Sequence, residues 1–101
     1  MQNLTITVSE ADPRTVAVDG QIDSHTATSF NDVLVEIPAD QTVHVDLGAV
    51  TFIDSSGLRV LVRAEKRQSA GGGALVIANP SAPVRRLLEI TGLASELTIV
   101  S

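Results

Sequence analysis

Apolar and polar residues alternate over residues 4–8 and again over residues 16–18, close to the start of the chain. A period of two is typical of strands that bury one face. Residues 10–14 lie between the two runs and are rich in turn-forming types, and Gly20 follows the second run. The pattern therefore predicts that the chain begins with an antiparallel β-hairpin.

Apolar residues then recur three or four positions apart from Ala27 to Ile37, which predicts an amphipathic helix. Asp23 and Ser24 precede this segment, and either side chain is suited to cap the helix by accepting hydrogen bonds from its first turn. Pro38 follows the last apolar position and cannot continue a helix. We therefore expect the first helix to lie between Asp23 or Ser24 and Pro38.

A strand and a second helix are predicted next. Apolar residues alternate over residues 43–47, and we interpret residues 48–53 as a connection. Residues 58–65 place apolar side chains at helical spacing, which marks the buried side of a helix. Residues 70–73 include three glycines and are expected to end this helix, since glycine readily adopts the left-handed conformation of a helix end.

The last elements are a strand, a helix and a strand. Residues 74–78 form a nearly continuous apolar run, which is typical of a strand covered on both faces, so we expect it at the centre of the sheet. The third helix is predicted to begin after Ser81, a suitable cap, and to end at Gly92. Residues 97–100 are predicted to form the final strand.

The predicted order of elements is β-β-α-β-α-β-α-β. Strands that are joined by helices run parallel, with right-handed crossovers. With 101 residues the chain is long enough for one core of ordinary size. We therefore predict a single α/β domain over residues 1–101, with a mixed, mostly parallel β-sheet, an N-terminal antiparallel hairpin and about three helices.

The composition indicates a packed, aliphatic core. Hydrophobic residues make up 44% of the chain, charged residues 19% and aromatic residues 2%. This balance is typical of a globular domain, and the scarcity of aromatic rings removes the stacking platforms of single-stranded nucleic-acid binders. The chain has no cysteine, which excludes disulfides, thiolate metal sites and cysteine nucleophiles.

The formal net charge of −5 argues against polyanionic partners, because it repels phosphate backbones and anionic lipid. Basic residues gather in two places, which we interpret as solvated helix faces. No uncharged apolar run approaches the ~18 residues of a membrane span, and the start of the sequence lacks the pattern of a signal peptide. We therefore expect a cytoplasmic protein with no direct nucleic-acid or membrane partner. The basic groups are Arg59, Arg63, Lys66 and Arg67, and Arg85 with Arg86.

The sequence Asp54-Ser55-Ser56-Gly57 stands where the second helix begins. Unpaired backbone N–H groups and the positive end of the helix dipole meet at such a position, so a serine there can cap the helix or carry a phosphate. A cap contributes ~1 kcal/mol and needs only one hydroxyl. We therefore interpret Ser56 as the better cap candidate and Ser55 as the better phosphate acceptor.

A phosphate on Ser55 brings ~1.5 to 2 negative charges beside Asp54. The helix N-terminus stabilises this charge, whereas the carboxylate repels it. Such opposed effects suit a switch, since they change a local surface and leave the aliphatic core undisturbed.

The sequence does not indicate an enzyme. A serine hydrolase needs a histidine near its nucleophile and usually a Gly-x-Ser-x-Gly turn, which is absent here. We interpret His25 as a surface residue at a helix start and His44 as a structural or edge residue of a strand. The glycine run 71–73 precedes a strand rather than a helix and lacks the Gly-Lys-Ser/Thr of a phosphate-binding loop. We therefore expect no catalytic residue, no cofactor and no metal site.

Three motifs occur in an order that resembles the STAS domains and, among them, the bacterial anti-sigma factor antagonists. The resemblance covers nearly the whole chain, and the middle motif is the most specific. The motifs are Gly20-Gln21-Ile22-Asp23, then Phe52-Ile53-Asp54-Ser55-Ser56-Gly57-Leu58, and finally Val84-Arg85-Arg86-Leu87-Leu88 followed by Thr91-Gly92-Leu93.

The resemblance implies a protein that, when unphosphorylated, binds an anti-sigma factor and so frees a sigma factor to direct transcription. In this family the anti-sigma factor is commonly also a serine kinase that binds ATP, phosphorylation ends the binding, and a separate serine phosphatase resets the cycle. The acceptor is the serine directly after the motif aspartate, which is Ser55 here. Asp23, Asp54, Ser56 and Gly57 are expected to shape, with Ser55, the partner-binding surface of a monomer or weak dimer.

A second interpretation keeps the fold and changes the role. STAS domains also serve as regulatory or scaffold subunits of stress-sensing assemblies and of anion or lipid transport complexes, where the serine is not always phosphorylated. The presence of both Asp54 and Ser55 favours the sigma-factor pathway. Many members carry a further helix after the last strand, whereas this sequence stops at Ser101, so contacts made by such a helix are not carried over.

Overall fold

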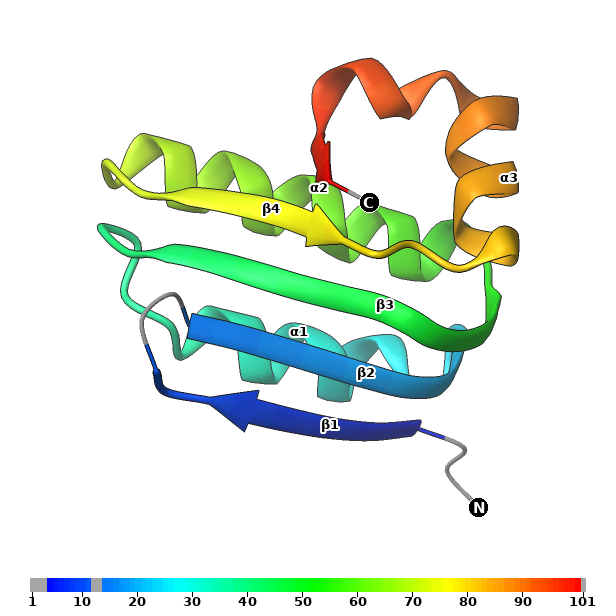
Figure 1. The fold of residues 1–101 in the computed structure, drawn as a ribbon, viewed down its shortest axis with the longest axis horizontal. Coiled ribbons are helices and arrows are strands. Elements are labelled where there is room, and N and C mark those ends of the chain that lie inside the picture. The colour runs from blue at the N-terminus through cyan, green and yellow to red at the C-terminus, as the bar shows by residue number, and fades with distance from the viewer. Residues whose placement is uncertain (1–3, 12–13, 101) are drawn as a thin grey trace.

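In the part of the chain that the structure describes, five strands form one sheet in the order β1-β2-β3-β4-β5 (Figure 1). The computed structural model describes residues 4–11 and 14–100, so Asp12 and Pro13 of the predicted turn lie outside the described residues. The elements in chain order are β1 (Leu4–Ser9), β2 (Arg14–Ile22), α1 (Ala27–Val35), β3 (Thr42–Ile53), α2 (Ser55–Ala70), β4 (Ala74–Ala78), α3 (Ala82–Thr91), the 3₁₀ helix η1 (Leu93–Glu96) and β5 (Thr98–Val100).

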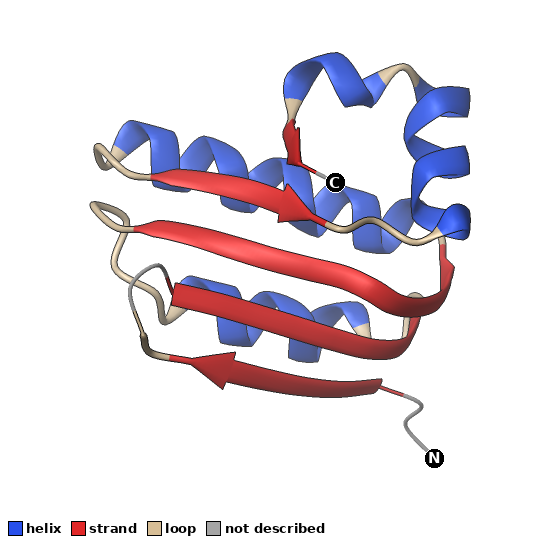
Figure 2. Ribbon diagram, viewed as in Figure 1, coloured by secondary structure: helices blue, strands red, loops and turns tan. Residues whose placement is uncertain are grey.

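The sheet is mixed, as predicted. β1 and β2 pair antiparallel, and the pairs β2–β3, β3–β4 and β4–β5 are parallel. Figure 2 shows α1 and α2 side by side on one face of the sheet, behind the strands in this view, with α3 beside the end of β3. The opposite face carries none of the helices that the structure describes. The predicted fold class is confirmed.

The core lies between the sheet and the helices α1 and α2, and Val84 and Leu88 of α3 extend it. Burial alternates along the first part of β2, where Val16 and Val18 are buried. Phe30 of α1 and Leu61 of α2 belong to the same buried cluster and are fully enclosed. Burial of a large apolar side chain contributes ~1.5–3 kcal/mol. Apart from Phe30 this cluster is aliphatic, in agreement with the composition.

β3 is longer than the sequence pattern predicts. It extends to Ile53, so residues 48–53 belong to the strand and not to a connection. Relative to β2, it carries one extra residue after Asp46 and another after Val50. Each such bulge shifts the alternation of side chains by one position. The period of two is therefore lost in this part of the sequence although the strand continues.

β4 does not lie at the centre of the sheet, contrary to the prediction. The central strand is β3, and β4 lies between β3 and the short edge strand β5. Leu75 and Ile77 are buried, whereas the other three residues of β4 are half-buried. These three residues are Ala74, Val76 and Ala78, whose modest size makes partial exposure inexpensive. A continuous apolar run therefore did not require cover on both faces.

Glycines end the helices as predicted. α2 ends at the glycine run, where Gly72 has a φ of +95°, a conformation that favours glycine. α3 is followed by Gly92. Ser81 occupies the N-cap position of α3, but its hydroxyl makes no capping hydrogen bond and is buried without a partner among the described residues. Ser81 therefore occupies the predicted N-cap position, but the hydrogen bond expected from its side chain is absent.

The C-terminal half of α2 is hydrogen-bonded to the end of α1 and to the segment that follows α1. The guanidinium of Arg67 donates to the carbonyl oxygens of Leu34 and Ile37. The side-chain amide of Gln68, which is buried, donates to the carbonyl oxygens of Pro38 at 3.1 Å and Gln41 at 2.9 Å. Two neighbouring residues of α2 thus supply donors to four backbone carbonyl groups.

Removal of the Arg67 guanidinium is expected to destabilise the domain. Arg67→Met keeps an unbranched side chain but leaves two carbonyl groups without this donor. We expect a loss of about 1–2 kcal/mol in the free energy of unfolding, because bonds from charged donors contribute roughly 1.5–3 kcal/mol and this side chain is partly exposed. Urea denaturation measures the loss. Arg63→Met, one turn earlier and exposed, is the matched control and should stay within about 0.5 kcal/mol of wild type. Equal losses in the two variants would contradict this role of Arg67.

Candidate functional site

Two neighbouring strand ends bring the predicted site together. β2 and β3 run parallel, and their last residues, Ile22 and Ile53, are partners in the register. The backbone N–H of Asp54 donates to the carbonyl oxygen of Ile22 at 3.1 Å. The segments that begin at Asp23 and Asp54 therefore leave the sheet side by side, at the same end of the sheet in Figure 1. The carboxyl ends of parallel strands are a common place for functional side chains.

Asp54, and not Ser56, is the N-cap of α2. Asp54 has an extended backbone with φ of −118° and ψ of −171°, and its carboxylate accepts a hydrogen bond from the backbone N–H of Ser56 at 2.9 Å. Its carbonyl oxygen accepts the first helical bond, from the N–H of Leu58. The prediction for Ser56 was wrong because aspartate caps as well as serine does, and the residue that leaves the strand in an extended conformation takes the position.

The two serines differ in their surroundings. Ser55 is the first residue of α2, is exposed, and makes no side-chain hydrogen bond to any residue that the structure describes. Ser56 is half-buried and borders a groove between α1 and α2. The uncommitted, accessible hydroxyl is thus that of Ser55, the residue that the sequence assigns as acceptor. Its phosphorylation stays a prediction.

Gly57 lies where α2 packs on the two strand ends. It is buried, and a Cβ atom at this position would lie 2.5 Å from Cγ2 of Ile22 and 3.0 Å from Cγ1 of Ile53. Glycine therefore permits the close approach of the helix start to the sheet. A direct contact between Gly57 and a partner stays a prediction.

Asp23 orders the turn that precedes α1. Its carboxylate accepts hydrogen bonds from the backbone N–H groups of His25 at 2.9 Å and Thr26 at 3.0 Å. The Thr26 hydroxyl accepts in return from the N–H of Asp23 and donates to the carbonyl oxygen of Gln21. The N-cap position of α1 is Thr26, so Asp23 caps the preceding turn and neither predicted cap residue of the helix was right.

The same hydrogen bonds act on the acidity of Asp23. The backbone N–H of Thr26, followed by that of His25, favours the charged carboxylate and holds the pKa of Asp23 below its ordinary value of 3.8. Asp23 is therefore an anion at neutral pH, next to the strand end from which Asp54 emerges.

The two histidines lie apart from each other. His25 is exposed in the turn before α1, as predicted for a surface residue. His44 is half-buried in the central strand β3, so it is not an edge residue. Neither sits beside the Ser55 hydroxyl as a hydrogen-bond partner among the described residues.

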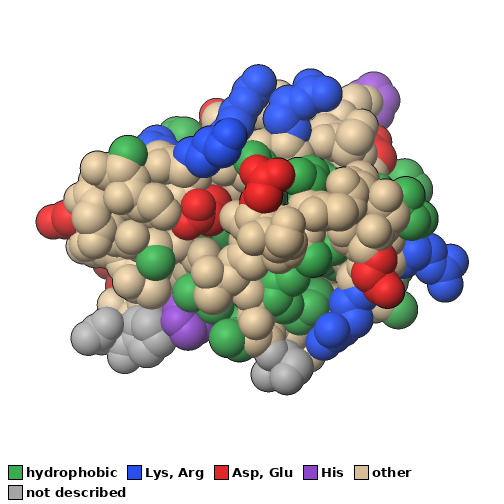
Figure 3. Space-filling view, turned by 90° about the horizontal axis from the view of Figure 1, so that it is seen from above, with side chains coloured by type: hydrophobic (Ala, Val, Ile, Leu, Met, Phe, Trp, Pro, Cys, Tyr) green, Lys and Arg blue, Asp and Glu red, His purple; other side chains and the backbone are tan. Residues whose placement is uncertain are grey.

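An apolar groove that the sequence patterns did not predict lies beside the motif. It has a volume of about 370 Å³ and is lined in part by Phe52, Pro83, Leu87 and Ile90. Phe52 is 46% exposed and Ile90 is 74% exposed. Figure 3 views the molecule from above, and hydrophobic side chains are visible in the lower middle and at the edges of this face, with acidic and basic side chains around them. The signal in the sequence was Phe52, one of only two phenylalanines.

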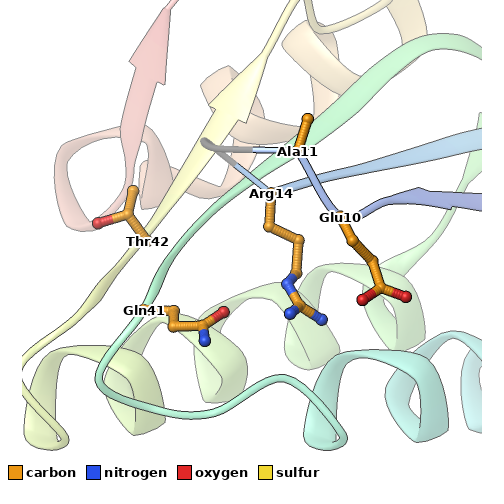
Figure 4. A pocket seen from close by; sticks show the side chains of 5 residues that line it. All are labelled: Glu10, Ala11, Arg14, Gln41 and Thr42. Atoms are coloured by element: carbon orange, nitrogen blue, oxygen red, sulfur yellow. The ribbon is translucent and has the colours of Figure 1, made fainter.

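A second hollow lies at the opposite end of the sheet (Figure 4). The side chain of Arg14 extends into it between Gln41 and Glu10, and Thr42 lines it from the start of β3. The Nε atom of Arg14 is buried without a hydrogen-bond partner among the described residues. Because Arg14 and Thr42 begin their strands, this hollow is separate from the site at the strand ends.

Residues 4–11 and 14–100 contain no cluster of three or more histidine and carboxylate side chains that could hold a metal ion. None of their helices has both the length and the apolar character needed to cross a bilayer.

Residues 5–101 match the family model of the STAS domain. The anti-sigma-B factor antagonist of Staphylococcus epidermidis is 36% identical over 94 residues, which cover 90% of this chain and 87% of the relative. That of Listeria monocytogenes is 33% identical over 101 residues, which cover 96% and 89%. The chain therefore belongs to the STAS domain family, as its motifs indicated.

The fold agrees with that of a solved relative. The crystal structure of an anti-sigma factor antagonist from Mycobacterium paratuberculosis has a TM-score of 0.84 at 27% identity, over 95% of this chain and 84% of that one. These three relatives are named as regulatory antagonists, and none of them carries the name of an enzyme.

The capping assignment can be tested by two alanine substitutions. Asp54→Ala removes the acceptor of the Ser56 N–H and is expected to lower the free energy of unfolding by about 1 kcal/mol, within a range of roughly 0.5–2 kcal/mol. Ser56→Ala leaves that bond in place and should change stability by less than about 0.5 kcal/mol. Urea denaturation measures both values. A larger loss for Ser56→Ala than for Asp54→Ala would restore the serine as the cap.

Asp23 is expected to make stability depend on pH. Because its folded pKa is lowered, its carboxylate stabilises the fold above the unfolded value near 3.8, and this contribution is lost as the pH falls through the folded pKa. Urea denaturation of wild type and Asp23→Asn from about pH 6 to about pH 2 measures the effect. The advantage of wild type should shrink as the solution is acidified, and a pH-independent difference would argue against it.

Proposed function

We propose that this protein is an anti-sigma factor antagonist that binds its partner through the strand-end site and is controlled at Ser55. In the unphosphorylated state it binds a cognate anti-sigma factor, and the sigma factor is thereby released. The names of the relatives support the class of function. The observation that carries the control step is the Ser55 hydroxyl, which is exposed, has no hydrogen bond among the described residues and stands at a helix N-terminus.

The strand-end site consists of Asp23, Asp54, Ser55, Ser56 and Gly57. Asp23 and Asp54 both use their carboxylates to hold backbone N–H groups, which fixes the shape of the turn before α1 and of the start of α2. Gly57 keeps α2 close to the strands. A partner then meets a surface whose backbone is ordered before binding, and such pre-organisation lowers the entropic cost of association.

Phosphorylation of Ser55 acts through charge. It adds about 1.5 to 2 negative charges next to the carboxylate of Asp54, and near Asp23 at the neighbouring strand end. The side chain of Ser55 contributes no hydrogen bond to the described fold, so the modification alters the surface and leaves the core in place. Loss of partner binding follows from repulsion and from the added bulk, without refolding.

The remaining parts of the cycle lie in other chains. The anti-sigma factor is itself a serine kinase that binds ATP, and a serine phosphatase restores the hydroxyl. The antagonist acts in the cytoplasm as one domain over residues 1–101, monomeric or weakly dimeric.

The switch predicts opposite behaviour for two variants of Ser55. Ser55→Ala should bind the anti-sigma factor as tightly as wild type and resist phosphorylation, while Ser55→Glu should bind at least about tenfold more weakly, or about 1.4 kcal/mol, because it places a carboxylate at the acceptor position. Isothermal titration calorimetry measures both affinities. The partner is recovered from the cells of origin by capture on immobilised Ser55→Ala.

Ser9→Glu is the control, since it makes the same substitution at an exposed position of β1 that pairs with Thr15 near the start of β2, away from the strand-end site, and should bind like wild type. Equal affinities of Ser55→Ala and Ser55→Glu for the anti-sigma factor would contradict control of binding at Ser55. Recovery of transporter subunits, together with no phosphate on Ser55 by mass spectrometry with or without stress, would favour a non-switch scaffold role instead.

A further inference from the structure

Ser55 lies at the N-terminal end of a group of basic side chains on one side of α2. At about 100° per residue, three basic side chains lie within about 80° of Ser55 around the helix axis. They are Arg59, Arg63 and Lys66, all of them exposed. Figure 3 shows Lys and Arg side chains grouped along the border of the molecule formed by α2. We call Arg59, Arg63 and Lys66 the cationic face.

The cationic face has no acidic partner in the described molecule. No carboxylate of residues 4–11 or 14–100 forms an ion pair with Arg59, Arg63 or Lys66. Arg59, Arg63 and Arg67 follow one another at intervals of four residues, and like charges at this spacing repel by roughly 0.2–0.5 kcal/mol per pair. Arg67 is occupied by the end of α1, whereas the other two are not. An external anion would relieve this repulsion.

A groove next to the cationic face offers neutral hydrogen-bonding groups as well. It lies between α1 and α2 and has a volume of about 210 Å³. Arg59 and Arg63 border it from α2, and Thr28 and Asn31 border it from α1, with Ser56 at its end. Guanidinium, hydroxyl and amide groups together are suited to bind carboxylates.

We propose that the groove and the cationic face dock an acidic segment of the protein that binds at Ser55. This inference rests on the proposed function and extends its surface from the start of α2 along the helix. The net charge of −5 disfavours a long polyanion such as nucleic acid. A short acidic segment experiences mainly the local field, because charges beyond about 10 Å are screened.

The groove and the cationic face also explain how a phosphate on Ser55 weakens binding further along α2. Arg59 lies one turn after Ser55, and side chains on a helix lean toward its N-terminus, so the guanidinium is in reach of a phosphate at that position. An intramolecular pair between the phosphate and Arg59 removes this cation from the partner. Phosphorylation thus repels the acidic segment and occupies a residue that binds it.

The experiment compares two double variants with the same net charge. Arg59→Gln with Arg63→Gln changes the charge from −5 to −7 on α2, and Thr5→Glu with Thr7→Glu makes the same change on exposed positions of β1. The affinity for the anti-sigma factor captured on Ser55→Ala is measured at about 50 mM and about 200 mM salt. Circular dichroism and urea denaturation establish that both variants fold.

The arginine double variant is expected to bind about tenfold or more weakly at the lower salt concentration and to lose most of the salt dependence, since charges at an interface act on association rates. The threonine double variant should bind within about threefold of wild type.

If wild type binds the anti-sigma factor and the arginine double variant binds it equally well, the inference about the groove and the cationic face is refuted and the proposed function stands. If wild type does not bind an anti-sigma factor, both fail. If the arginine substitutions weaken only the binding of single-stranded DNA, the cationic face belongs to a nucleic acid and the inference is overturned.

Discussion

The parallel pairing of the last residues of β2 and β3 determines where every part of the candidate site lies. The bond from the N–H of Asp54 to the carbonyl oxygen of Ile22 sets the direction in which both segments leave the sheet. Gly57 then allows α2 to approach within van der Waals distance of Ile22 and Ile53. At the start of that helix the carboxylate of Asp54 accepts a hydrogen bond from the N–H of Ser56. The polar surface is therefore a product of apolar packing beneath it.

The two ends of α2 have different tasks. Near its C-terminus, Arg67 and Gln68 bind backbone carbonyl groups at and after the end of α1 and hold the helix against its neighbour. Near its N-terminus, the exposed side chains are free of such bonds among the described residues, and Ser55 is one of them. Anchoring at one end keeps the other end in a defined place while leaving its side chains available.

The sequence predicted the elements with strong local signals and missed those that depend on distant contacts. The hairpin, the three helices and the glycine-terminated ends follow from periodicity and turn chemistry. The length of β3 was hidden by bulges after Asp46 and Val50, which exist only relative to β2. The cap at Asp54 was missed because three adjacent side chains can cap and the backbone exit from β3 selects one. The exposure of Phe52 likewise depends on where α3 packs.

Because the Ser55 side chain is isolated, the stability of this domain does not depend on its hydroxyl. Within the described residues its hydroxyl caps no helix, fills no cavity and joins no hydrogen-bond network. A codon change at this position can therefore remove or restore the hydroxyl without passing through a variant that folds poorly. The serine can be gained or lost over evolutionary time while the scaffold stays the same, whereas Asp54 and Gly57 take part in the packing and hydrogen bonding of the fold and are constrained by it.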